Sequence, residues 1–151
     1  MNILTKLNNI IEITLPIFVA MLSWKFIQNL ELSQVQYIAS TVSTVSGILF
    51  GFVMASITIL ASAKENKLII NTTKTKYLPN LVSRLNQTMG LLLLVCIVFL
   101  SSLFVKIDDM IFYNEVKLVS IIIVLGVFIF SLAVYKFVNV WYEFSKFASH
   151  M

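Results

Sequence analysis

The segment from Leu32 to Ala63 contains no charged residue, and this run limits what the chain can fold into. A helix needs about 20 mostly apolar residues to cross about 30 Å of hydrocarbon, and the run exceeds that length. Composition points the same way, because 59% of the 151 residues are hydrophobic and only 12% are charged. Soluble domains have about 45–50% apolar and about 25% charged residues. The sequence therefore predicts an integral membrane protein.

We expect an all-α, polytopic fold with four transmembrane helices. No alternating pattern suggests a barrel, so the backbone must satisfy its hydrogen bonds inside helices. The first span is the weakest, because only Ile13 to Trp24 is free of charge, and an interfacial or re-entrant hairpin is the alternative there. The expected single domain, 1–151, has spans at about 10–30, 41–63, 86–105 and 118–138.

Basic residues predict the orientation. The loop 64–85 has one acidic residue, Glu65, and five basic ones: Lys64, Lys67, Lys74, Lys76 and Arg84. Basic loops stay in the cytoplasm, so with four spans both termini are expected there, in a multi-pass protein of the bacterial inner membrane. The five basic residues are candidates for contact with membrane lipid or with a cytoplasmic protein partner, and headgroup contact alone accounts for them.

Small residues gather on one face of the second span. On a helical wheel Gly47, Gly51, Ala55, Thr58 and Ser62 lie together, and such rows let membrane helices approach closely. The face can pack against a helix of the same chain or of a neighbouring copy, giving a homo-oligomeric bundle. It can instead line a polar route through a ring of subunits. We favour packing, because this helix has no ionisable residue.

Polar groups at the ends of the other spans have simpler interpretations. Glu12 is expected to be an interfacial charge near a helix N-terminus, and a transporter role is rejected because no other span carries a partner charge. Pro79 is placed to begin a short helix that runs into the third span. The fourth helix is expected to continue as an amphipathic stalk, with Lys136, Asn139 and Glu143 on one face.

A catalytic interpretation finds no support in the sequence. Cys96 and His150 are each the only residue of their type, and we find no paired acids at depth and no nucleophile–base arrangement. We therefore expect a non-enzymatic protein with no cofactor, no metal site and no direct binding of nucleic acid.

Two stretches, "VSGILFGFVMASITILASAKENKLI" and "YLPNLVSRLNQTMG", resemble small four-span inner-membrane proteins of bacterial antiphage defence loci, nearest the membrane subunit of the Kiwa system. The resemblance covers Ser40 to Gly90 and transfers no functional residue. It implies an oligomeric sensor or scaffold subunit that acts through a cytoplasmic partner. The alternative is a membrane-permeabilising effector, channel-like or holin-like.

Overall fold

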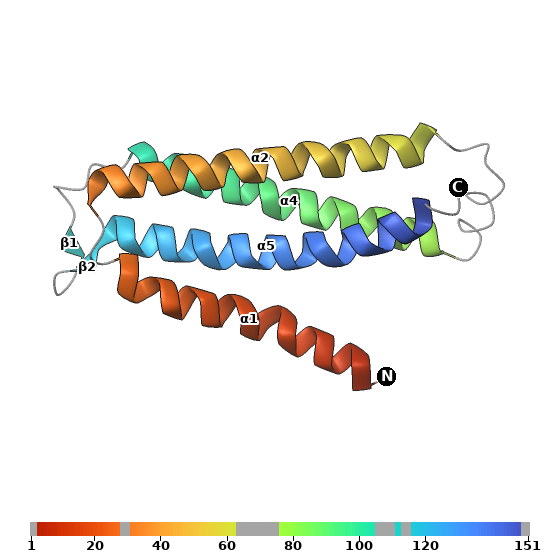
Figure 1. Ribbon diagram of the computed structural model, residues 1–151, viewed down its shortest axis with the longest axis horizontal. Helices are drawn as coiled ribbons and strands as arrows, with labels where there is room; N and C mark the ends of the chain where they lie inside the picture. The colour runs from red at the N-terminus through yellow and green to blue at the C-terminus, as the bar shows by residue number, and fades with distance from the viewer. Residues whose placement is uncertain (1–2, 28–30, 63–75, 105–110, 113–115, 149–151) are drawn as a thin grey trace.

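The computed structural model describes residues 3–27, 31–62, 76–104, 111–112 and 116–148, without the side chains of 3–9, 32, 111–112 and 116–118. Three of the basic loop residues, Lys64, Lys67 and Lys74, lie outside this part of the chain. The described elements are four helices and one short antiparallel strand pair, as Figure 1 shows: α1 (Ile3–Ile27), α2 (Leu32–Ser62), α4 (Tyr77–Phe104), β1 (Ile111–Phe112), β2 (Val116–Lys117) and α5 (Leu118–Ala148).

All four helices are long and apolar enough to cross a membrane, which confirms the expectation of a helical, multi-pass membrane protein. The pairing of β1 with β2, between the third and fourth spans, was not expected from the sequence.

The helices extend further than the spans drawn from hydropathy. α2 begins at Leu32 rather than near residue 41, and residues 77–85 belong to α4 rather than to the loop. The short helix expected around Pro79 is therefore the beginning of α4 itself, with the proline in the first turn, where its missing N–H costs no hydrogen bond. The expected helical stalk after the fourth span is also present, because α5 continues to Ala148.

The helix α4 lies between α2 and α5, while α1 packs chiefly on α5 at the edge of the bundle (Figure 1). We call the end that carries β1 and β2 the hairpin end. The opposite end, where α1 begins and α5 finishes, is the terminal end. Toward the terminal end α1 diverges from the other helices, as Figure 1 shows. The first and last helices of the chain are therefore neighbours.

The core follows the buried side of α4, where inward-facing residues recur at alternating intervals of four and three: Leu81, Leu85, Thr88, Leu92, Val95, Phe99 and Ser102. This spacing, about 3.5 residues, keeps one helical face against its neighbours along the whole span. α2 meets α4 with small residues, among them Ala39, Ser46 and Ser56, all buried. The Ser46 and Ser56 hydroxyls donate to carbonyls of their own helix, at 2.8 and 3.0 Å, so their burial leaves no polar group without a partner.

A glycine sets the distance between α4 and α5 in the half of the bundle near the hairpin end. The buried Phe99 ring lies over Gly126, so closely that a Cβ built on the glycine would meet ring atoms at 2.8 and 2.9 Å. Real Cβ atoms do not approach a neighbour so closely, and any side chain at position 126 would displace the ring.

Candidate functional site

The small residues predicted as a packing face lie on the outside of the chain. Gly47, Gly51, Ala55, Thr58 and Ser62, which we call the glycine face, are all exposed, and a Cβ added at either glycine would meet no atom within 4 Å. α2 packs on α4 with a different face, displaced by about 100° on the wheel because Ser46 precedes Gly47 by one residue. Of the two packing alternatives, contact within the same chain is therefore not seen among the described residues. Contact with a second copy stays a prediction.

The hydroxyls of the glycine face already have partners. Thr58 donates to the carbonyl of Met54 at 3.0 Å, and Ser62 donates to that of Thr58 at 2.9 Å. These bonds within the helix let hydroxyl groups face an apolar neighbour without a desolvation penalty. The face is therefore suited to close packing, and its hydroxyls do not require water.

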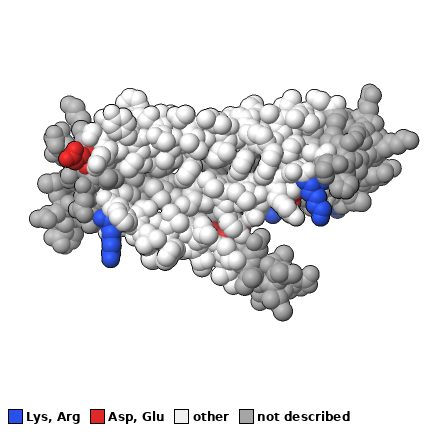
Figure 2. Space-filling model, in the orientation of Figure 1, with Lys and Arg blue, Asp and Glu red and all other residues white. Residues whose placement is uncertain are grey.

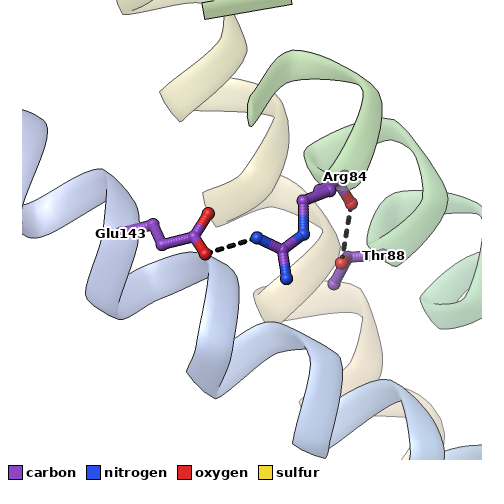
Figure 3. Close-up of polar contacts among 3 residues, drawn as sticks. All are labelled: Arg84, Thr88 and Glu143. Atoms are coloured by element: carbon purple, nitrogen blue, oxygen red, sulfur yellow. Dashed lines mark hydrogen bonds and ion pairs between the residues drawn. The ribbon is translucent and has the colours of Figure 1, made fainter. Parts of the chain in front are cut away.

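Of the predicted basic contacts, the structure describes Lys76 and Arg84. Lys76 is exposed and precedes α4, with a left-handed backbone φ of 62°. Arg84, on α4, donates to the Glu143 carboxylate on α5 (Figure 3). Beside it, the Thr88 hydroxyl donates to the Arg84 carbonyl at 2.9 Å, as Figure 3 also shows. Arg84 thus joins α4 to α5 within the chain, a role the sequence analysis did not give it.

A second ion pair joins α1 to α5. The Lys136 ammonium lies 2.9 Å from a Glu12 carboxylate oxygen, and both side chains keep less than a third of their surface exposed, 30% and 28%. This corrects the expectation that no other span carries a partner charge for Glu12. Pro16, buried one turn later, has no N–H to donate, so the helical bond to the Glu12 carbonyl cannot form. Glu12 thus sits where the backbone of α1 is weakened and its side chain is anchored.

Three of the four ion-paired side chains, Glu12, Arg84 and Lys136, line a small cavity toward the terminal end, with a volume of about 130 Å³. Three helices contribute to its wall, and six of its seven lining residues are polar or charged: Glu12, Arg84, Gln87, Thr88, Lys136, Asn139 and Val140. We call these residues together with Glu143 the polar cluster. Two cations and two carboxylates make its formal charge zero. Acidic and basic side chains are visible near the notch where α1 leaves the bundle (Figure 2).

The lengths of the uncharged segments give the depth of the polar cluster. On α5 no charge occurs from Leu118 to Tyr135, about 27 Å of helix, and Lys136 follows at once. On α4 the uncharged segment begins directly after Arg84. The hydrocarbon layer is about 30 Å thick, so on the evidence of α4 and α5 we expect the cluster near the boundary of hydrocarbon and headgroups on the terminal side.

The polar character does not continue toward the hairpin end. Between α4 and α5 the next buried layers are Leu92, Phe99 and Ile123, with exposed fractions of 0–1%. Among the described residues of a single chain, the space between these helices therefore offers no continuous polar route across the membrane. Nor do the described residues include a group of three or more His, Cys, Asp or Glu side chains that could hold a metal ion.

Comparison of the chain with models of protein families, with curated proteins and with solved structures found no match. What the structure defines is a class: a multi-pass membrane protein with four candidate membrane-spanning helices.

Proposed function

We propose that the chain is a non-enzymatic membrane subunit that assembles with copies of itself through the glycine face of α2. The observation that carries this proposal is the open space over Gly47 and Gly51, on a helix that already packs on α4 with a neighbouring face. α2 lies at the edge of the bundle, so this face is accessible along the span (Figure 1).

A second copy of α2 is the occupant that fits the face. Association of helices in lipid depends on van der Waals packing, since lipid tails are as apolar as leucine, and glycines let two backbones approach closely. Two copies related by a twofold axis bring the same small residues together, so one row of glycines serves both partners. A face of this kind is complementary to itself, and no second type of surface is needed.

The test is the oligomeric mass of the full chain in nanodiscs or mild detergent, measured for wild type, Gly51→Ile and Gly90→Ile. Gly90, on α4, is the matched control, because it too is exposed and a Cβ there would meet nothing within 4 Å. We expect Gly51→Ile to lower the mass to that of one chain and Gly90→Ile to leave it unchanged. A monomeric wild type, or an assembly that tolerates Gly51→Ile, would contradict the proposal.

The wider role proposed for this subunit is that of a sensor or scaffold in bacterial antiphage defence, acting with a cytoplasmic protein that meets the basic loop. Its support is the resemblance over Ser40 to Gly90 together with the basic residues of that loop. Cells carrying the chain with its neighbouring genes should plate phage less efficiently than cells without them, and Gly51→Ile should restore plating. Equal plating for every phage tested would count against this role.

The permeabilising effector is the competing function, and liposome flux separates the two. The hydroxyls of the glycine face bond to their own helix, and the interior near the hairpin end is apolar, so we expect vesicles to stay tight at every protein-to-lipid ratio. Ion or dye flux above that of protein-free vesicles, lost in Gly51→Ile, would instead establish a pore lined by that face.

A further inference from the structure

We infer that the polar cluster at the terminal end is a binding site for the headgroup of a zwitterionic aminophospholipid, a phosphate joined to a primary ammonium. The proposal is independent of self-assembly, because the cluster belongs to α1, α4 and α5, whereas the glycine face belongs to α2.

The depth of the cluster selects lipid as the source of the ligand. The uncharged segments of α4 and α5 end at Arg84 and Lys136, which puts both cations at the level where phospholipid phosphates lie. The α1 helix, which supplies Glu12, diverges from its neighbours on this side (Figure 1), and charged side chains are visible beside the resulting notch (Figure 2). A headgroup can therefore reach the cluster sideways from the bilayer.

The charges of the cluster match a zwitterion rather than an anion. Arg84 and Lys136 offer a guanidinium and an ammonium to a phosphate, while Glu12 and Glu143 offer carboxylates to a ligand ammonium. Because the four charges sum to zero, an anionic headgroup would leave the two carboxylates facing an added negative charge. A headgroup with both signs can insert between the ion pairs and give each protein charge an opposite neighbour.

Uncharged donors complete the site. Gln87 and Asn139 line the same cavity, and their amide groups can donate to phosphate oxygens. The cavity volume of about 130 Å³ is roughly that of four water molecules in the liquid, which is room for a compact polar headgroup.

The helices α1 and α5, which supply Glu12 and Lys136 to the cluster, also offer an apolar surface to an acyl chain. Nearer the hairpin end, α1 and α5 form an apolar groove of about 400 Å³, whose walls include Ile17, Met21, Leu125 and Phe128. A phospholipid held by its headgroup at the polar cluster would have apolar side chains of these helices beside its tails.

The experiment measures lipid retained by the full chain after extraction from nanodiscs that contain equal amounts of phosphatidylethanolamine, phosphatidylcholine and phosphatidylglycerol with identical acyl chains. We expect phosphatidylethanolamine to be enriched about fivefold over phosphatidylglycerol, the ratio that one favourable charge contact at a membrane surface supplies. Phosphatidylcholine should be retained less than phosphatidylethanolamine, because its quaternary ammonium has no N–H to donate to a carboxylate.

Charge variants make the prediction specific. Glu12→Gln leaves the cluster with a net positive charge and should reverse the preference toward phosphatidylglycerol. Lys136→Gln makes it net negative and removes a partner of the phosphate, so it should lower the retention of phosphatidylethanolamine without favouring phosphatidylglycerol. Lys25→Gln is the matched control, because this exposed lysine lies at the other end of α1, away from the cluster. A purely structural ion pair would not reverse lipid preference.

Two further arms cover misfolding and a soluble ligand. Gln87→Leu and Asn139→Leu leave both ion pairs in place and should still lower phosphatidylethanolamine retention. Soluble glycerophosphoethanolamine should fail to displace the lipid; displacement at comparable concentration would overturn lipid as the source. Equal retention of the three lipids by wild type, unchanged preference in Glu12→Gln, or unchanged retention in Lys136→Gln would overturn the site itself.

Discussion

The two halves of this bundle differ in the contacts that join their helices. Near the hairpin end, α4 and α5 meet through the contact of Phe99 with Gly126, which is apolar and closely packed. Near the terminal end, buried apolar residues such as Leu85 and Val140 are accompanied by two partly exposed ion pairs beside a small polar cavity. We therefore expect the contact of Phe99 with Gly126 to be sensitive to side-chain volume, and the two ion pairs to be sensitive to charge and salt.

The largest expected effect comes from emptying the closely packed half. Phe99→Ala should destabilise the fold by about 3 kcal/mol, the lower end of the range for such substitutions. The value is at the lower end because lipid replaces water around the unfolded helices, so the cavity supplies most of the loss. Phe104→Ala is the control, since this ring is 86% exposed. Unfolding titrations with a denaturing detergent measure the free energy of unfolding of both variants. Equal losses in the two variants would show that the Phe99 contact is no more important for stability than an exposed ring.

Filling the same contact should cost less than emptying it. Gly126→Ala places a Cβ against the Phe99 ring and should destabilise the fold by about 1–3 kcal/mol. Gly90→Ala adds the same methyl group where nothing lies within 4 Å and should be neutral or slightly stabilising. In the double variant with Phe99→Leu, the smaller side chain should recover part of the loss. Strict additivity of the two changes would show that the residues do not touch.

The smallest effect is expected at the terminal end. Glu12 and Lys136 are about 30% exposed, so their coupling energy, from a double-mutant cycle with glutamine at each position, should be at most about 1 kcal/mol. The coupling should weaken as salt is added, whereas the losses at Phe99 and Gly126 should not change. A coupling of several kcal/mol, insensitive to salt, would mean that the Glu12–Lys136 pair is shielded from solvent, contrary to its exposure.

The sequence predicted the helices better than the contacts between them. Uncharged segments such as Leu32 to Ala63 predict a span because length and apolarity alone set that requirement. Pro79 correctly indicated where a helix begins ahead of the third span. The sequence did not reveal which face of α2 packs within the chain, because small residues occur in two neighbouring rows, one with Ser46 and Ser56 and the other with the glycines. A wheel identifies small residues and gives no indication of which row a neighbour covers.

The Glu12–Lys136 pair was missed for a topological reason. Consecutive helices are usually neighbours, so nothing local in the sequence brings the first helix beside the last. A signal was present in Lys136, Asn139 and Glu143, which share a polar face at the end of the fourth span. Such a face beside hydrocarbon calls for a polar partner, and Glu12 is the acidic residue of the first span.

The placement of α1 against α5 also has a consequence for biosynthesis. A ribosome delivers α1 to the membrane before α5, yet α5 is the helix on which α1 chiefly packs. Between those two events α1 must stay in the bilayer, or beside the insertion machinery, with Glu12 still lacking Lys136. Completion of the bundle therefore waits for the last helix, and a nascent chain arrested before residue 118 would expose an acidic first helix without its counter-charge.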